Sequence, residues 1–343
     1  MTKPKISLVV GNGFSMSFAA YTGLVDNWDT QEPLHWNVKC PSTGGNFLDS
    51  LIRLKTLFEE NEKLPSFEVF KLALDIDYCE SIGLDSFETT LEARHFLTIA
   101  FSEYSKLQSE IISEEWNWYK WIQLHKDNIN GALSLNYDLL LESVFNKISK
   151  NYYSFQVNHH DFGIPLVKPH GSVDFEMADG MISYQAAYPL LNFVDLNNTP
   201  IKQLDLDNLI YPRDQAQCII PNEANKYSDF QWVKPANDWL SERLGEAEYC
   251  IFIGISYFDC DKTELDHVIN QLTDDCIIIV ANPNPPEDFL KIIEGRPVKI
   301  WTSYNGPVDS SGEIIPLKCL KTGKPLTKCF CRSGLSYQHC PCH

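Results

Sequence analysis

Two short segments in the middle of the sequence carry the side chains best suited to catalysis. Asn136 and Asp138 stand two residues apart where an apolar run from Gly131 ends, and His170 follows a second short run. An amide can position a water or a ribose hydroxyl, a carboxylate can orient a neighbour, and an imidazole can exchange a proton near pH 7. Each of these residues on its own also fits an ordinary turn or loop.

A glycine-rich turn near the N-terminus is a candidate nucleotide site. Residues 6–10 form an apolar run that leads into Gly11, Asn12, Gly13, Phe14 and Ser15. Glycines let a backbone approach a ligand closely, and a helix that starts there offers N–H groups to a phosphate. The fingerprint of hydride-transfer enzymes needs a third glycine three residues on, but Met16 stands there. Nucleotide binding and a plain strand-to-helix turn are therefore equally compatible with this segment.

Short apolar runs between helical segments predict an α/β fold, with a Rossmann-like parallel sheet and helices on both faces. The predicted strands cover residues 6–10, 131–135, 153–157, 165–168, 249–255, 277–281 and 298–301. Ligands of such sheets collect at the carboxyl ends of the strands. Gly254, Ser256 and Asn282 follow two of the later strands and therefore join the candidate site.

The predicted organisation is one domain over residues 1–310 with a helical insertion at about 46–128. Asn46, Ser86 and Ser113 precede the three helical stretches of this insertion. Its tryptophans are predicted to pack in the core. A further helix is predicted at 232–244.

The C-terminal segment 318–343 is rich in cysteine and in basic residues. Its thiol pairs are spaced for a tetrahedral Zn²⁺ ion, with reduced free thiols as the alternative; the predicted ligands are Cys329, Cys331, Cys340 and Cys342. The segment resembles the zinc motif of the SecA translocase tail, although Pro341 separates the last two cysteines and leaves His343 as an alternative fourth ligand. Five basic residues and no acidic one indicate a docking surface for a partner or for the acidic body of the protein itself.

The order of these motifs resembles the sirtuin-like NAD-binding family, and most of all its bacterial branch that hydrolyses NAD⁺ in anti-phage defence. The resemblance covers about residues 5–285. It implies an NAD⁺ glycohydrolase in which His170 activates a ribose hydroxyl or a water and Asn136 positions the attacking water. It also implies that NAD lies against the glycine turn, with Asp138 near the nicotinamide ribose and Gly254, Ser256 and Asn282 beside the adenosine half. A homo-oligomer and a defence partner such as an ATPase are further implied.

Two other functions remain open at this stage. Sirtuins that deacylate proteins carry paired Cys-x-x-Cys motifs after the His-Gly segment, and this sequence contains none. That absence argues against an NAD-dependent protein deacylase but leaves NAD⁺ cleavage untouched. A non-catalytic sensor of NAD or ADP-ribose is the remaining alternative.

The composition is that of a globular protein and excludes several classes of function. The chain has 343 residues, of which 44% are hydrophobic and 22% are charged. A formal net charge of −18 disfavours general binding to nucleic-acid phosphates. The apolar runs are far shorter than the ~20 residues of a membrane span, and no secretory signal is recognised. We therefore expect a cytoplasmic protein whose thiols are reduced or bound to metal.

Overall fold

The structure is a computed structural model. It describes residues 3–24, 35–40, 43–154, 163–177, 201–210, 216–218, 220, 233–309 and 311–316. The four candidate zinc-binding cysteines lie outside these residues, so the zinc site stays a prediction. Among the described residues, no group of three or more His, Cys, Asp or Glu side chains could hold a metal ion. None of the described helices is both long enough and apolar enough to cross a bilayer.

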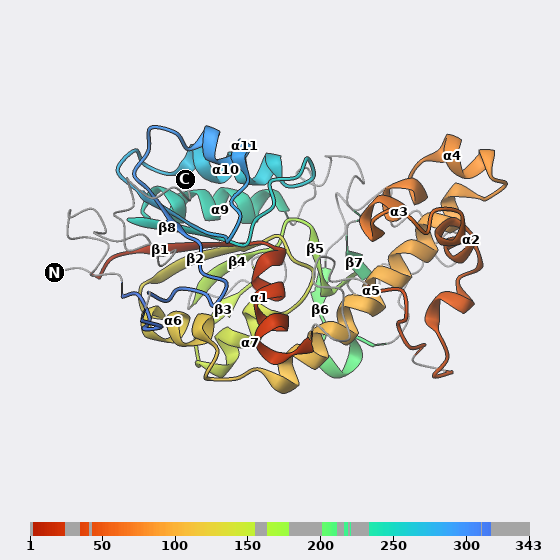
Figure 1. Cartoon of the computed structure of the whole chain (residues 1–343), viewed down its shortest axis with the longest axis horizontal. Helices are drawn as coiled ribbons and strands as arrows, with labels where there is room; N and C mark the ends of the chain where they lie inside the picture. The colour runs from red at the N-terminus through yellow and green to blue at the C-terminus, as the bar shows by residue number, and fades with distance from the viewer. Residues whose placement is uncertain are drawn as a thin grey trace.

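A seven-stranded parallel sheet forms the centre of the molecule (Figure 1). Its strands are β1 (Ile6–Val10), β2 (Ile129–Ser134), β3 (Tyr152–Tyr153), β4 (Ile164–Val167), β8 (Tyr249–Ile253), β9 (Ile277–Ala281) and β10 (Val298–Trp301). Their order is β10-β9-β8-β1-β2-β4-β3. The predicted Rossmann-like α/β class is therefore confirmed, and the strand boundaries differ from the predicted ones by only a few residues.

A second sheet, which the sequence did not predict, follows the His-Gly segment. It is antiparallel and three-stranded, with β5 (Gly171–Met177) between β6 (Ile201–Gln203) and β7 (Ala216–Cys218). The first strand begins directly after His170, so the turn that holds the histidine joins the two sheets.

Helices cover both faces of the large sheet because successive strand residues point to opposite sides. In β1, Leu8 and Val10 join the core beneath α1, α5, α6 and α7, whereas Val9 joins the core beneath α9, α10 and α11 (Figure 1). These helices are α1 (Asn12–Thr22), α5 (Ser86–Ile111), α6 (Asn117–His125), α7 (Leu140–Lys147), α9 (Val233–Gly245), α10 (Lys262–Gln271) and α11 (Glu287–Ile292).

The predicted helical insertion is present between β1 and β2. Besides α5 and α6 it contains η2 (Phe47–Ser50), α2 (Ile52–Glu60), α3 (Ser66–Ala73) and α4 (Ile76–Ser81). In Figure 1, α2, α3 and α4 lie to one side of the sheet, and the long α5 runs from them back towards α7. The predicted cap Asn46 is confirmed, because its side chain accepts a hydrogen bond from the Leu48 N–H at 3.0 Å.

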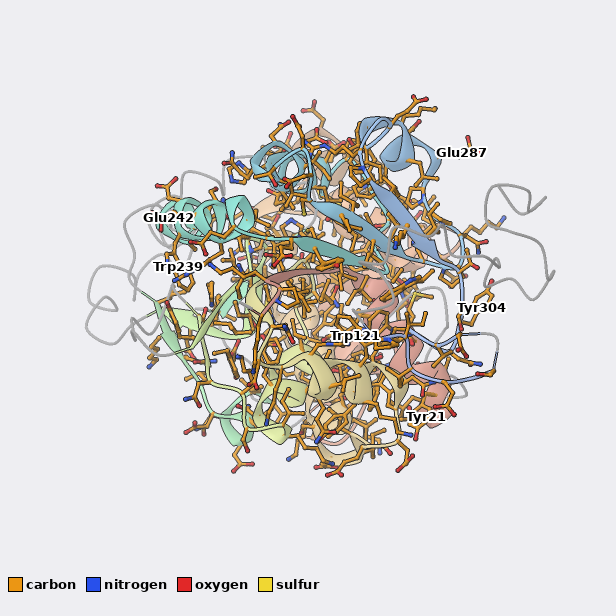
Figure 2. All side chains as sticks on the ribbon, turned by 90° about the vertical axis from the view of Figure 1, so that its left-hand side faces the viewer. Tyr21, Trp121, Trp239, Glu242, Glu287 and Tyr304 are labelled. Atoms are coloured by element: carbon orange, nitrogen blue, oxygen red, sulfur yellow. The ribbon has the colours of Figure 1, made fainter. Side chains whose placement is uncertain are left out.

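Two of the predicted helix starts are wrong by one to three residues. Helix α5 is capped by Asp85, whose carboxylate accepts from the Glu88 N–H at 2.8 Å, and Ser86 is its first residue. Ser113 caps a turn instead of a helix, since its hydroxyl accepts from the Glu115 N–H. Helix α6 therefore begins only at residue 117. The core role of the tryptophans is confirmed: Trp121 is fully buried, and Figure 2 shows it deep among packed side chains.

The order of the strands places a topological switch point beside β1. After β1 the chain builds the sheet to one side through β2, β3 and β4, and it then returns to the other side of β1 with β8, β9 and β10. The loops that follow β1 and β8 therefore run in opposite directions and open a crevice, where ligands bind in open α/β sheets.

The glycine turn packs directly against the loop that follows β8. The N–H of Gly13 donates to the Gly254 carbonyl at 2.9 Å. A Cβ added to Gly254 would lie 2.4 Å from the Gly13 Cα, and Gly254 itself has φ +60°. These two positions therefore require glycine because two backbones meet there, whatever ligand lies nearby.

We expect Gly254→Ala to lower the free energy of unfolding by about 3 kcal/mol or more, because it adds overpacking to left-handed backbone strain. Gly295 is the matched control: its φ is +88° and its surroundings are open. Gly295→Ala should cost only the strain, about 1–2 kcal/mol. Urea unfolding of both variants measures the difference, and equal costs would show that the contact with Gly13 contributes nothing.

Candidate functional site

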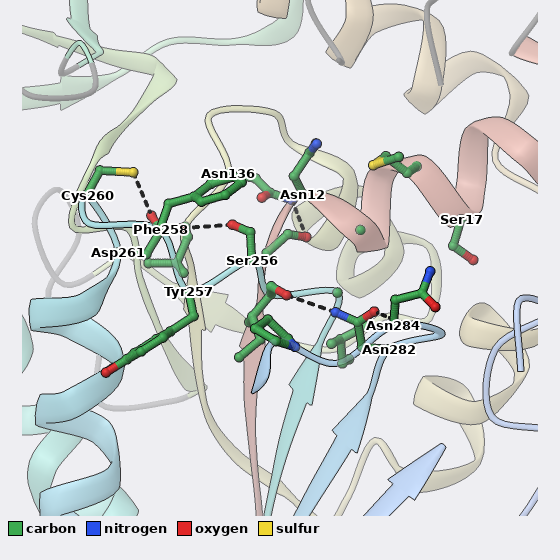
Figure 3. A pocket seen from close by; sticks show the side chains of 18 of the residues that line it. Asn12, Ser17, Asn136, Ser256, Tyr257, Phe258, Cys260, Asp261, Asn282 and Asn284 are labelled. Carbon is green, nitrogen blue, oxygen red and sulfur yellow. Dashed lines mark hydrogen bonds between the residues drawn. The ribbon is translucent and has the colours of Figure 1, made fainter. Parts of the chain in front are cut away.

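A cavity of about 1300 Å³ opens at the carboxyl ends of the strands. Its walls come from the loops after β1, β2, β4, β8, β9 and β10, with one side contributed by α3 of the helical insertion. Figure 3 shows Asn12, Asn136, Ser256 and Asn282 reaching this space from four different strand ends. The cavity thus occupies the crevice that the switch point opens.

Most of the site residues predicted from the sequence line this one cavity. They are Gly11, Asn12, Gly13, Asn136, Asp138, His170, Gly254, Ser256 and Asn282. Phe14 instead lies in the core, with its ring 4.9 Å from that of Trp116. Ser15 is also buried, and it is not among the lining residues. Asn136 and His170, which are 34 positions apart in the sequence, therefore share one cavity.

The amide of Asn136 is held in a defined orientation. Its Nδ2 lies 3.1 Å from the Gly11 carbonyl and 3.2 Å from the Ser15 hydroxyl. A carbonyl oxygen can only accept, so the amide must turn its NH₂ group towards Gly11. Both N–H hydrogens are then used within the protein. The Oδ1 atom of Asn136 is thereby left as a hydrogen-bond acceptor for a ligand in the cavity.

Asp138 supports the orientation of the Asn136 amide through the Ser15 hydroxyl. Its Oδ2 accepts from the Ser15 hydroxyl at 2.6 Å, and its Oδ1 accepts from the Leu140 N–H at 3.1 Å. Burial raises the pKa of Asp138 above its usual value, and the bond from Ser15 and the charge of Lys168 offset only part of this rise. Both carboxylate oxygens act as acceptors, which is the arrangement of the ionised form. Asp138, Ser15 and Asn136 are thus one connected network.

The N–H groups of the glycine turn are largely satisfied within the protein. Gly11 donates to the Ile253 carbonyl at 2.9 Å, Gly13 to Gly254, and Phe14 to Gly11 at 3.0 Å. These three N–H groups are therefore not available to a phosphate, whereas close approach of a ligand to the glycines stays a prediction. Their main partner is the loop after β8.

His170 lies between two carboxylates that the sequence analysis missed. Its Nδ1 is 3.8 Å from Asp261 Oδ1, and its Nε2 is 3.8 Å from Glu264 Oε2. Burial lowers the pKa of His170, but the contact with Glu264 and the charge of Asp261 more than offset it, so the pKa is raised above its usual value. Asp261 is held in turn by the Ser256 hydroxyl at 3.2 Å. The imidazolium form of His170 is therefore stabilised.

Two exposed aromatic side chains flank the cavity. Phe258, in the loop after β8, is 68% exposed, and Tyr304, after β10, is 74% exposed (Figures 2 and 3). Tyr257 is fixed by a hydrogen bond from its hydroxyl to Asp266 at 2.8 Å and has φ +54°. Exposed rings at a cavity are suited to stacking against a planar ligand.

The chain was compared with known proteins in three ways. No protein-family model matches it, and no curated protein matches it. Among solved structures, a Sir2 homologue in complex with NAD aligns with a TM-score of 0.41 and 10% identity over 88% of this chain and 85% of that one. A Sir2 homologue mutant bound to ADP-ribose aligns with a TM-score of 0.38 and 10% identity over 88% of each chain.

The carboxylates around His170 lead to a prediction about its protonation. We expect the pKa of His170 to lie above 6.5 in an NMR titration of the imidazole. Asp261→Asn and Glu264→Gln should each lower it, because each removes a negative charge that stabilises the imidazolium. Asp266→Asn, which alters the carboxylate that accepts from Tyr257, is the control and should leave it unchanged. A His170 pKa that stays the same in all three variants would contradict this electrostatic assignment.

Proposed function

We propose that this protein is an NAD⁺ glycohydrolase, which cleaves NAD⁺ with water to nicotinamide and ADP-ribose. The observation that carries the proposal is the meeting of Asn136 and His170 in one cavity at the switch point of the sheet. The order of the sequence motifs supplies the choice of NAD⁺. The site supplies the two groups that the reaction needs, an acceptor that can orient a water and an imidazole that can take a proton.

The dimensions of the cavity support a dinucleotide. Its volume of about 1300 Å³ exceeds the roughly 300–1,000 Å³ typical of small-molecule sites. Its lining extends from His170 and Asp261 at strands β4 and β8 to Asn282 and Tyr304 at strands β9 and β10. In the proposal, the nicotinamide ribose lies at the first end and the adenosine lies at the second.

The reaction requires little covalent chemistry from the protein. The bond between the ribose C1′ and the pyridine nitrogen breaks, its electron pair neutralises the pyridinium, and nicotinamide leaves as a neutral base. A water oxygen then bonds to C1′ and loses one proton. Asn136 Oδ1 is the acceptor that orients this water, so its contribution is positioning.

His170 takes the released proton in this proposal. Asp261 and Glu264 stabilise the imidazolium that results, which is the part a carboxylate plays beside a catalytic histidine. Because the pKa of His170 is raised, the basic form gains population only as the pH rises above the usual histidine range. The same carboxylates offset positive charge that develops on the ribose.

Activity of purified variants tests these roles. We expect Asn136→Ala and His170→Ala to lower kcat for release of nicotinamide from NAD⁺ by about 10²–10⁴-fold, the usual effect of removing an acid–base or positioning group. Asn146→Ala and His267→Ala are the controls. The Asn146 amide bonds Tyr152 and the His267 ring bonds Ser241, both away from the cavity. Full activity in either site variant would refute its role.

The defence role and the partners are part of the same proposal. We infer that the enzyme depletes NAD⁺ after a phage trigger, as a homo-oligomer or together with a partner such as an ATPase. Cellular NAD⁺ should therefore fall after infection in cells that express the wild type, and should stay constant with Asn136→Ala. Release of O-acetyl-ADP-ribose from an acetylated peptide would instead indicate a deacylase. Tight NAD⁺ binding without turnover, even in infected cells, would indicate a sensor.

The network beneath Asn136 gives a separate prediction. Ser15→Ala removes one of the two acceptors of the Asn136 amide and the donor to Asp138 Oδ2, so the amide gains freedom to turn. We expect kcat to fall by about 10–100-fold while the KM for NAD⁺ changes little. Thr22→Ala, at the far end of the same helix, removes a hydroxyl that bonds only the backbone of its own helix, and it should leave kcat unchanged. If Ser15→Ala and Thr22→Ala have the same kcat, the Ser15 hydroxyl does not position the Asn136 amide.

A further inference from the structure

A buried lysine joins the two segments of the site. Lys168 follows strand β4 directly, two residues before His170, and its side chain is 1% exposed. Its Nζ donates to the Asp138 carbonyl at 2.7 Å, to Glu142 Oε1 at 2.8 Å and to the Tyr137 carbonyl at 3.5 Å. The three hydrogens of the ammonium group therefore each meet an acceptor.

Two of these three acceptors are the backbone carbonyls of Tyr137 and Asp138, which directly follow Asn136. The ammonium group thus fastens the loop after β2 to the end of β4, and Lys168 is not among the residues that line the cavity. A buried ion pair contributes little net stability compared with apolar residues of the same volume. The position of Lys168 between the two segments therefore calls for an explanation other than stability.

We propose that Lys168 is a positioning residue, which holds the segment 136–138 in place through its carbonyls and brings a positive charge to Asp138. The contacts of Lys168 do not depend on the proposed function, whereas the measurement of kcat rests on the proposed NAD⁺ cleavage. An ionised Asp138 accepts from Ser15, whose hydroxyl in turn accepts from Asn136. Lys168 therefore acts on the ligand-facing amide through two intermediate groups.

The groups that face Asp138 come from four elements. Ser15 approaches from α1, Lys168 from the end of β4, Tyr104 from α5, and the Leu140 N–H from the start of α7. Burial raises the pKa of the Tyr104 phenol above its usual range, so Tyr104 remains neutral. Lys168 is thus the cation that partly offsets the burial of the Asp138 carboxylate.

The test compares variants that differ in the charge at position 168. Lys168→Gln keeps a side-chain donor for the carbonyls but removes the charge. Lys168→Met combined with Glu142→Gln removes the ion pair without leaving a buried carboxylate unpaired at that place. Glu142→Gln alone is the control, because Lys168 and its two carbonyl contacts stay. Circular dichroism establishes which variants are folded.

Two readouts are measured on the folded variants. The first is the titration of the Asp138 carboxyl by carbon NMR, which needs no activity. We expect its pKa to rise by about one unit without the lysine charge and to stay near the wild-type value in Glu142→Gln. The second is NAD⁺ cleavage at pH 8, where kcat should fall by about tenfold or more with KM nearly unchanged.

The outcomes separate this inference from the proposed function. If Lys168→Gln or the double variant is folded and shows the Asp138 pKa and the kcat of Glu142→Gln, Lys168 is not a positioning residue. If the Asp138 pKa rises but the wild type does not cleave NAD⁺ even in infected cells, the role of Lys168 stands and the proposed function fails.

Discussion

The orientation of the Asn136 amide depends on two groups at the start of α1, the Gly11 carbonyl and the buried Ser15 hydroxyl. The Gly11 carbonyl accepts from the Asn136 amide, and the Ser15 hydroxyl accepts from the same amide while it donates to Asp138. Ser15 belongs to α1, whereas both of its partners follow β2. The orientation of the Asn136 amide therefore depends on the distance between the start of α1 and the end of β2. Any change that moves α1 along the sheet changes the group presented to a ligand.

The contact between two glycines determines where α1 starts. Gly13 and Gly254 approach so closely that neither position has room for a Cβ, and Ser15 lies only two residues further on. The glycine turn thus acts on the site from within the protein, by seating the helix that carries Ser15. Close packing of two backbones and close approach of a phosphate produce the same glycine pattern in a sequence, and Gly11 and Gly13 also line the cavity.

The sequence predicted those features that depend on neighbouring residues along the chain. The strands were predicted from runs of Ile and Val, and Asn136 and His170 from their positions just after strands. Asp261 and Glu264 were missed because acids at the start of a helix are common, and only the packing of α10 against the turn after β4 brings them to His170. Nothing in the sequence distinguishes Lys168 from other lysines at strand ends. Its contacts arise only because β4 lies beside β2 in the sheet.

The charges around the cavity bear on the kind of reaction the site can support. His170 is flanked by two carboxylates, and Asp138 is a third at the same end of the cavity, while the buried ammonium of Lys168 is turned towards Glu142 and the backbone beneath. Lys71 and Lys262 line the same cavity, so the two carboxylates act on the centre beside His170 and not on the whole cavity. In the proposed cleavage of NAD⁺, positive charge moves from the leaving base onto the ribose, and carboxylates beside His170 are suited to offset it.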